Sequence, residues 1–316
     1  MFRSVLRALA PVEVLSGVRR VVVGYSGGID SSVMIHLLGD VAVHLGFEIH
    51  LLHVHHGVRG LEADRDAEFC QEQARRLGLP LDVEFLGTKR SDAAEHHLRK
   101  ERYRALLAAM HRTQSQRIFL AHHQDDQVET VLFRLLTGAG FRGLSGMRAF
   151  RPPLVRPMLG IPKQAIEAEA ALCGVPYVQD SSNRWAHPKR NFIRRQLLPL
   201  LRAQINPRIG DHLSALGDLA NSTNGWFDRA TEIYFTSWAK EGGFDLSLFS
   251  AADPLLRRHW LHRAYKRYHP GGGGLRREQV LLIERFLCHG SPRGSLALPG
   301  GCLTKARGAF RLEFTG

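Results

Sequence analysis

The sequence predicts an α/β fold: a doubly wound parallel sheet, then a helical linker and a small α+β C-terminal unit. Short β-branched runs alternate with helical patterns through the first half, and conspicuous polar residues follow those runs directly. Strands that alternate with helices form parallel sheets, whose ligands bind beyond the carboxyl ends of the strands. The 316 residues, 44% of them hydrophobic, suffice for a sizeable core and for more than one domain.

The first half contains four predicted strands, each followed by a helix. We expect the strands at 20–25, 48–54, 81–85 and 117–121, and the helices at 30–45, 63–77, 92–111 and 125–136. Three polar segments follow a strand directly, at Ser26, at 53–56 and at 122–126. Because parallel strands end at one edge of the sheet, these segments are expected to meet there.

The second half is less regular and carries several prolines after Gly138. Helices are expected at 164–173, 190–201 and 206–239, the last broken at 221–225, with loops at 242–243 and 271–274 and turn-rich strands over 296–314. We therefore place a main domain at 1–215, a helical linker at 216–240 and a small domain at 241–316.

Basic residues exceed acidic ones, with 43 Lys and Arg against 30 Asp and Glu, a formal charge of +13. Such a surplus favours a polyanionic partner. Two runs, 184–208 and 255–277, each hold seven basic residues and no acid: Arg184, Lys189, Arg190, Arg194, Arg195, Arg202, Arg208; and Arg257, Arg258, Arg263, Lys266, Arg267, Arg276, Arg277. A solvated helix face is the ordinary explanation for one such run, whereas two favour contact with an RNA backbone.

The four cysteines are far apart and form no CxxC pair, which argues against a zinc ribbon or a redox pair. The N-terminal segment lacks the small-residue cleavage pattern of a signal peptide, and no apolar run is long enough to span a bilayer. We expect a soluble, cytoplasmic protein without a membrane partner.

The sharpest motif is SGGIDSS, which comprises Ser26, Gly27, Gly28, Ile29, Asp30, Ser31 and Ser32. It lies between a strand and its helix, where glycines allow close approach and backbone N–H groups at the helix terminus attract an anion. The serines can donate hydroxyl hydrogen bonds. Asp30 would repel a bare phosphate, so it suggests a bridging Mg²⁺ ion.

The sequence argues against two other interpretations of this loop, a Walker A loop and a nucleophile elbow. No G-x-x-x-x-G-K-[ST] sequence occurs, which excludes a Walker A loop. Gly24 to Gly28 also fit G-x-S-x-G, the nucleophile elbow of serine hydrolases. Only one strand precedes Ser26, however, and the Asp-Ser-Ser that follows has no role in a hydrolase.

A second candidate group lies at 122–129 and pairs histidines with carboxylates. Asp126 and Glu129 are three residues apart on one helix face and can hold Mg²⁺ or an ammonium group. Helix capping is the alternative role, and it suits Asp125 better than Glu129. Arg99 and Arg102 share another face, where a surface salt-bridge ladder and a phosphate clamp remain open alternatives.

These motifs, taken in order, resemble the tRNA(Ile)-lysidine synthetases of the PP-loop ATP pyrophosphatase group. The matching pieces are SGGIDS at 26–31, HVHHGVR at 53–59, Glu95 with Arg99, Arg102 and Tyr103, HHQDDQVETVLFRLLTGAGFRGLSGM at 122–147, RPML at 156–159, and DSSN and RNFIR within 180–194. They cover about the first two-thirds of the chain. His97 stands where the family often has Arg.

The resemblance implies an enzyme that adenylates the carbonyl oxygen on carbon 2 of the wobble cytidine of isoleucine tRNA and then joins free L-lysine to that carbon. ATP, Mg²⁺, that tRNA and lysine are the implied partners, and a homodimer is allowed. Ser26 to Ser32 with His53 would bind ATP, Asp30 would hold Mg²⁺, and Arg102, His122, Asp126 and Glu129 would line the lysine site. The main domain would be catalytic and the small domain tRNA-binding. The expected tRNA contacts are Lys189, Arg190, Arg194, Arg195, Arg257, Arg258, Arg263, Lys266 and Arg267.

Two rivals differ in class. Another PP-loop enzyme, such as a tRNA thiolase, would use a different nucleophile, and the missing CxxC pairs argue against it. An RNA-binding protein with a degenerate nucleotide fold would need no intact Ser26, Asp30, Asp126 and Glu129.

Overall fold

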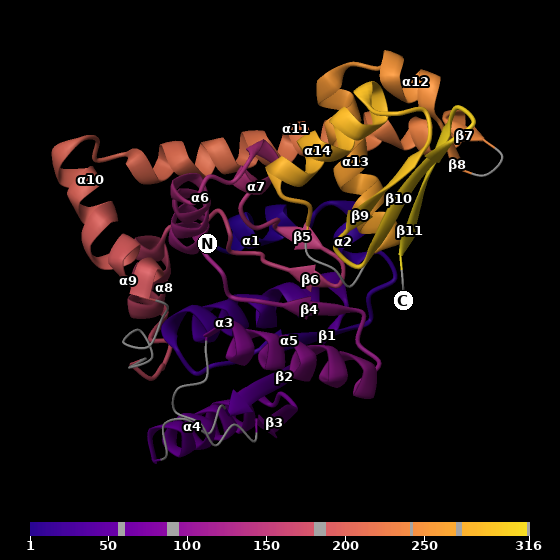
Figure 1. Cartoon of the computed structure of the whole chain (residues 1–316). Coiled ribbons are helices and arrows are strands. Elements are labelled where there is room, and N and C mark those ends of the chain that lie inside the picture. Colours follow the sequence, from indigo (N-terminus) through magenta and orange to yellow (C-terminus); the bar gives the residue numbers. More distant parts are fainter. Residues whose placement is uncertain (56–60, 87–94, 180–187, 241–242, 270–273, 315–316) are drawn as a thin grey trace. The chain divides into compact units, whose positions relative to one another are not determined.

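The computed structural model describes residues 1–55, 61–86, 95–179, 188–240, 243–269 and 274–314 (Figure 1). The chain divides into two compact units, residues 1–139 with 143–218 and residues 140–142 with 219–316. The division falls within helix α11, inside the segment for which we expect a helical linker.

The first unit is built on a six-stranded sheet in the order β3-β2-β1-β4-β6-β5. Its strands are β1 (Arg20–Gly24), β2 (Glu48–His55), β3 (Leu81–Phe85), β4 (Arg117–Phe119), β5 (Phe150–Arg151) and β6 (Leu154–Val155). Parallel ladders join all neighbouring strands except β5, which pairs antiparallel with β6 at one edge. The doubly wound parallel sheet predicted from the sequence is thus confirmed.

Helices cover both faces of this sheet because strand side chains alternate. Val21 and Val23 pack with helices α3 and α8 in one core, whereas Val22 packs with α5 in another. The helices of this unit are α1 (Phe2–Leu9), α2 (Val12–Leu15), α3 (Ile29–Leu45), α4 (Leu61–Leu77), α5 (Glu95–Arg112), α6 (Gln124–Leu136), α7 (Phe141–Leu144, shared with the second unit), α8 (Lys163–Cys173), α9 (Pro188–Phe192), the π-helical turn η2 (Ile193–Leu197), α10 (Leu198–Gln204) and the start of α11 (Ile209–Ser237).

The chain reverses its direction across the sheet at β1. It steps outward from β1 to β2 and β3, then returns to place β4 on the other side of β1. Such a reversal leaves a crevice beyond the carboxyl ends of the two strands, where α/β proteins bind ligands. The segments after β1 and β4 are those that carry Ser26–Ser32 and His122–Glu129.

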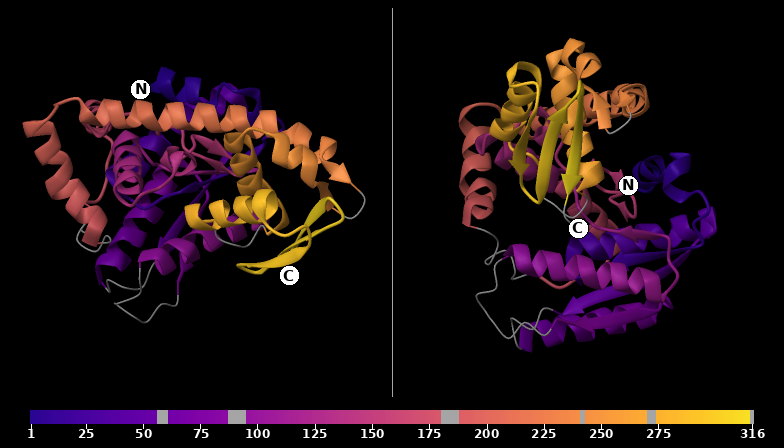
Figure 2. Two further views of the ribbon diagram at one scale, coloured as in Figure 1. Left: turned by 45° about the horizontal axis from the view of Figure 1, so that its top comes forward. Right: turned by 45° about the vertical axis from the view of Figure 1, so that its right-hand side comes forward.

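The predicted elements match the observed ones to within a few residues, with informative exceptions. The helix expected at 190–201 is interrupted by the π-helical turn. The short strands β5 and β6 were not predicted, because no clear sequence pattern marks them. The break expected at 221–225 is wrong, because α11 runs unbroken from Ile209 to Ser237 (Figure 2). Ala220 and Asn224 are buried there, and packing outweighs the weak helix propensity of Asn, Ser, Thr and Gly. Residues 92–94, 242 and 271–273 of other predictions lie outside the described ranges.

The second unit has its own core around a five-stranded antiparallel sheet in the order β7-β8-β11-β10-β9. Trp238, Trp260 and Phe310 are central to this core, with helices α13 and α14 supplying much of it. Its elements are β7 (Ala239–Lys240), β8 (Gly243–Asp245), α12 (Leu246–Ala251), α13 (Pro254–Tyr268), α14 (Arg277–His289), β9 (Gly294–Leu298), β10 (Gly301–Ala306) and β11 (Ala309–Phe314). The strands expected over 296–314 are confirmed. Within the described ranges, no helix has the length and apolar character that crossing a bilayer requires.

A buried lysine caps the last turn of α14. Lys305, 3% exposed, donates from Nζ to the carbonyl oxygens of Phe286 at 2.7 Å, Gly290 at 3.1 Å and Leu287 at 3.2 Å. The last carbonyls of a helix lack partners within it and carry the negative end of its dipole, so an ammonium group satisfies both needs.

Lys305→Met is expected to lower the free energy of unfolding of the second unit by about 2–4 kcal/mol, because it leaves buried carbonyls without a donor. Urea unfolding followed by tryptophan fluorescence measures this, since Trp238 and Trp260 lie in that core. Arg311→Met, on the exposed side of neighbouring β11, is the matched control and should change stability little. Equal unfolding midpoints for the two variants would contradict the capping role.

Candidate active site

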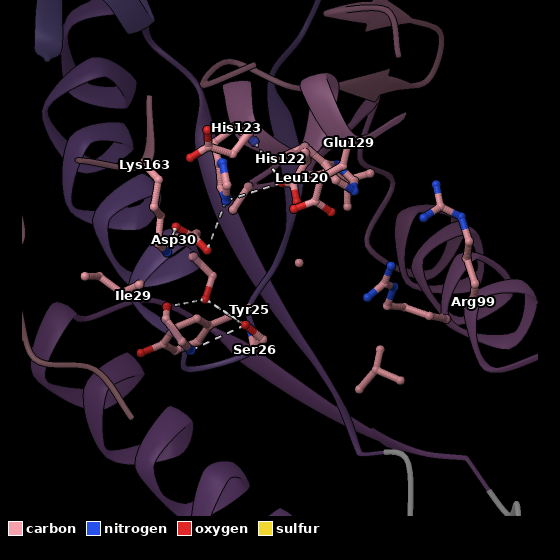
Figure 3. Close-up of a pocket in the computed structure, with 18 of the residues that line it drawn as sticks. Tyr25, Ser26, Ile29, Asp30, Arg99, Leu120, His122, His123, Glu129 and Lys163 are labelled. Atoms are coloured by element: carbon pink, nitrogen blue, oxygen red, sulfur yellow. Dashed lines mark hydrogen bonds and ion pairs between the residues drawn. The ribbon is translucent and has the colours of Figure 1, made fainter. Parts of the chain in front are cut away.

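A pocket of about 1470 Å³ opens at the carboxyl ends of β1, β2 and β4 (Figure 3). The residues that line it all belong to the first unit. Pockets for a single small ligand span roughly 300–1,000 Å³, so this one has room for a nucleotide and a second substrate. The pocket includes residues from both predicted groups: Ser26, Gly28, Ile29, Asp30 and Ser31 from the first, and His122, Asp126 and Glu129 from the second.

The loop after β1 is organised by its own hydroxyl groups. Ser31 Oγ donates to the carbonyl oxygen of Gly28 at 2.9 Å and lies 3.1 Å from Ser26 Oγ. Ser32 Oγ donates to the carbonyl oxygen of Gly27 at 3.3 Å. The loop then enters α3 at Ile29, so the free N–H groups of the first helical turn point toward the pocket side of the loop. Ser31 and Ser32 thus fix the backbone of the loop with their hydroxyl protons, and Ser26 can donate to a ligand.

Gly27 has a φ of +82°, a left-handed conformation that other residues adopt with strain. A Cβ at this position would lie 3.1 Å from both Cys70 Sγ and Val178 Cγ2. The carbonyl oxygen of Gly27 also accepts the backbone N–H of Val178 at 3.0 Å. The turn is therefore held between α4 and the segment at 177–179.

Asp30 faces a lysine and a histidine across the pocket. Lys163 Nζ lies 2.5 Å from Asp30 Oδ1, and His123 Nε2 lies 3.7 Å from Asp30 Oδ2 (Figure 3). Lys163 is not among the predicted site residues; it begins α8 and is 133 residues from Asp30 along the chain. A lysine after Pro162 at a helix start, beside the quoted RPML motif, was the available signal.

The two carboxylates of α6 converge on one arginine of the π-helical turn. Arg194 donates from Nε to Glu129 Oε1, and its Nη2 lies 3.3 Å from Asp126 Oδ1. Glu129 is 8% exposed, and burial raises its pKa above the ordinary carboxyl range although Arg194 opposes the shift. The expectation that Asp126 and Glu129 share a face is confirmed by this common partner.

The residue that caps α6 is Asp126, whereas the sequence favoured Asp125 for this alternative role. Asp126 Oδ2 accepts the backbone N–H of His123 at 3.1 Å, which satisfies a donor at the helix start. Asp125 instead pairs with Arg202 at 3.2 Å. Asp126 therefore joins the helix start to the pocket, with one oxygen on the backbone and the other on Arg194.

Two histidines of the predicted site have different surroundings. His53 lies within β2, and its Nδ1 is 3.0 Å from the carbonyl oxygen of Tyr25; a carbonyl only accepts, so Nδ1 carries the proton. Burial lowers the pKa of His53. For His122 the pKa is lowered well below its usual value, by burial first and then by the charges of Arg156, Arg102 and Arg99. Both rings are therefore neutral at pH 7. His56, Gly57 and Arg59 lie outside the described residues.

Arginines from α5, α6 and α9 approach the pocket from another side. Arg99, Arg102, Arg134 and Arg190 all line it. Burial lowers the pKa of Arg134, and the nearby charges of Arg190 and Arg99 lower it further. Arginines that crowd together against their mutual repulsion form a region of positive potential, which suits an anion. This arrangement favours the phosphate clamp over the surface salt-bridge ladder for Arg99 and Arg102.

The structure separates the basic residues of the first acid-free run. Lys189 and Arg195 are exposed on α9 and η2, whereas Arg190 and Arg194 line the pocket. The residues 180–187 that precede them, including DSSN, lie outside the described ranges.

In the second run, α13 directs several arginines into its own unit. Arg257 and Arg258 both pair with buried Glu284, at 2.9 and 2.6 Å. Arg263 donates to Thr231 Oγ1 at 2.9 Å and pairs with Glu232, which also holds Arg267 at 3.2 Å. Lys266 and Arg267 are exposed. Charge counted along the sequence therefore overstates what this helix offers an outside partner.

The residues around Asp30 suit a Mg²⁺ ion only in part. Asp30 supplies hard carboxylate oxygens beside the phosphate loop, the ligand type that Mg²⁺ takes. Among the described residues, no group of three or more His, Cys, Asp or Glu side chains forms a metal cage. Asp30 is therefore the one residue to which we assign an oxygen ligand for such an ion, which would neutralise phosphate charge there.

Comparison with known proteins places these features in a family. Residues 2–201 match the family described as the PP-loop domain. The chain is 41% identical over 201 residues to a tRNA(Ile)-lysidine synthase of Pseudomonas aeruginosa, covering 62% of this chain and 44% of that protein. It is 33% identical over 277 residues to the tRNA(Ile)-lysidine synthase of Methylococcus capsulatus, covering 84% and 60%. The chain thus spans 44% and 60% of the lengths of these two curated relatives.

A solved structure supports the fold. The U34-tRNA thiolase NcsA from Methanococcus maripaludis, described with its [4Fe-4S] cluster, superposes with a TM-score of 0.57 at 19% identity, covering 70% of this chain and 78% of that one. The parallel sheet, the loop after β1 and the match over 2–201 agree, and the chain belongs to the PP-loop domain family.

Proposed function

We propose that this chain ligates L-lysine to carbon 2 of the wobble cytidine in an isoleucine tRNA with a CAU anticodon. ATP would adenylate the carbonyl oxygen on that carbon and release pyrophosphate. The ε-amine of lysine would then attack the carbon and expel AMP. The names of the curated relatives support the reaction. The observation that carries it is one pocket that joins a phosphate loop to the carboxylate pair of Asp126 and Glu129.

The phosphate end of the pocket is suited to ATP. Gly28 removes a side chain from the path of the phosphates, the Ser26 hydroxyl can donate a hydrogen bond, and the start of α3 adds backbone N–H groups. Asp30 would hold Mg²⁺, which would neutralise charge on the departing pyrophosphate. Donors fixed before the reaction stabilise developing charge without reorganisation, and the serine network fixes them here.

The other end of the pocket is suited to an alkylammonium group. Asp126 and Glu129 supply negative charge, and burial makes Glu129 a stronger base than an exposed carboxylate. Only the neutral amine is a nucleophile, so the ammonium must lose a proton before attack. Glu129 is the acceptor we assign to that proton. Arg102 and neutral His122 line the space between the two ends.

The tRNA would contact basic residues of both units. We assign Lys189 and Arg195 to the sugar–phosphate backbone, with Arg190 and Arg194 nearer the reacting base. Arg257, Arg258, Arg263, Lys266 and Arg267 remain predicted contacts, and exposed Lys266 and Arg267 are the better candidates. An enzyme that uses ATP on tRNA would act in the cytoplasm. Assembly as a homodimer stays a prediction.

Labelled lysine is expected to enter an isoleucine tRNA transcript with a CAU anticodon only when ATP and Mg²⁺ are both present. Scintillation counting of precipitated RNA measures it, with a CAU methionine tRNA as the control. RNA-stimulated pyrophosphate release without lysine incorporation would instead favour a thiolase-like PP-loop enzyme. Neither activity would favour an RNA-binding protein.

Gly27→Ala is expected to weaken ATP binding about tenfold or more, because the strained turn and the contacts with Cys70 and Val178 shift the loop. Isothermal titration calorimetry with a non-hydrolysable ATP analogue measures the effect. Gly39→Ala, inside α3, is the matched control, since nothing lies within 4 Å of its added Cβ. Unchanged affinity in Gly27→Ala would remove this loop from the ATP site.

Replacing Lys189 and Arg195 together by Gln is expected to make the slope of log affinity for tRNA against log salt shallower by about two, roughly one per lost phosphate contact. Filter binding between low and moderate salt measures the slope. Replacing Arg75 and Arg76 on α4 by Gln removes two exposed charges that pair with Glu72 and should leave the slope unchanged. Equal slopes for the two double variants would show that 189–195 is a solvated face.

A further inference from the structure

Arg194 already holds the carboxylates that the proposed function assigns to lysine. Its Nε donates to Glu129 Oε1 and its Nη2 lies 3.3 Å from Asp126 Oδ1. The other oxygen of Asp126 accepts the backbone N–H of His123. An internal cation thus occupies the place where a substrate cation is expected.

Arginine and lysine compete for this place on electrostatic grounds. Glu129 is 8% exposed and the Arg194 side chain 38% exposed, so water screens the pair only in part. A second cation on the same oxygens would lie beside the guanidinium and be repelled by it. An ammonium group that takes Glu129 Oε1 and Asp126 Oδ1 must therefore displace Arg194.

The backbone under Arg194 offers a route for that withdrawal. Residues 193–197 form a π-helical turn between α9 and α10, and such turns are rare and concentrate at functional sites. A π-turn holds more residues than an α-turn, so converting one to the other rotates the side chains along it. Buried Ile193 and Leu198 anchor the helix on both sides of this change.

A bound nucleotide would give Arg194 a new partner in the same pocket. Arg194 lines the pocket together with Ser26 and Asp30, where the phosphates of a bound nucleotide would be. Guanidinium groups bind phosphate oxygens in a bidentate manner, with strength comparable to a carboxylate pair. Contacts with the phosphate oxygens can therefore replace the contact that Arg194 makes with Glu129.

We propose that Arg194 is an internal substitute for the substrate ammonium group: it fills the carboxylate pair in the free enzyme and releases it when a nucleotide binds. This inference rests on the proposed function. It makes lysine binding conditional on the nucleotide, so that the amine site opens after the activating substrate has arrived. Arg194 is a positioning residue in this scheme, because it controls access to Glu129 and takes no part in bond formation.

The test is equilibrium dialysis of labelled L-lysine without RNA, with and without a non-hydrolysable ATP analogue and Mg²⁺. The wild-type protein should bind lysine at least about fivefold more tightly with the analogue than without it. Arg194→Gln should bind lysine tightly without the analogue and lose most of that dependence. Adding Glu129→Gln to Arg194→Gln should abolish the tight binding, which would place the ammonium group on Glu129.

Gln196→Ala is the matched control. It changes an exposed residue of the same π-helical turn and should keep the wild-type dependence on the analogue. Thermal melting of each variant checks that the first unit stays folded. Arg194→Gln that binds lysine no more tightly than the wild type, while remaining folded, overturns the inference.

The outcome is separable from that of the proposed function. If the wild-type protein transfers lysine to tRNA but Arg194→Gln shows no tightened binding, the ligase function stands and only the inference is lost. If the wild type transfers no lysine and no variant binds it, both are lost.

Discussion

The return of the chain across β1 is the constraint on which the pocket depends. Two strands that are neighbours in the sheet, β1 and β4, end at the same edge and leave a crevice beside the segments that follow them. The gap between the loops receives the phosphate loop from one strand and the start of α6 from the other. A sheet wound in one direction only would have placed Ser26 and Glu129 far apart. Topology therefore brings together groups that are remote in sequence.

Charge pairing then sets the state of the pocket without substrate. Asp30 holds Lys163, and Asp126 and Glu129 hold Arg194. A half-buried carboxylate without a partner would be costly or would take up a proton, so each acid is matched by a cation of the chain itself. ATP, Mg²⁺ and lysine would enter as replacements for these internal partners. The same arrangement that stabilises the empty pocket can thus set the order in which it fills.

Local features were the ones the sequence could predict. The phosphate loop, the strand before it and the spacing of Asp126 and Glu129 are contained in short segments with clear periodicity or turn chemistry. Lys163 and Arg194 could not be assigned in this way, because their partners lie 133 and 65 residues away. The break expected at 221–225 failed for a related reason, since burial of Asn224 is a tertiary effect. The acid-free run on α13 suggested more exposed positive charge than the structure shows. Glu284, which neutralises two of its arginines, comes from another helix.

The two glycines of the phosphate loop are subject to different physical constraints. Gly27 needs its left-handed backbone and has Cys70 and Val178 against it, so the fold itself requires glycine there. Gly28 has a φ of −71°, which any residue can adopt, and it lines the pocket, so we attribute its glycine to the close approach of a ligand. In a lineage that kept this architecture but abandoned nucleotide chemistry, position 28 would be free to drift while position 27 stayed glycine. Glycine at position 27 therefore reflects the needs of the fold, and glycine at position 28 reflects the needs of the ligand.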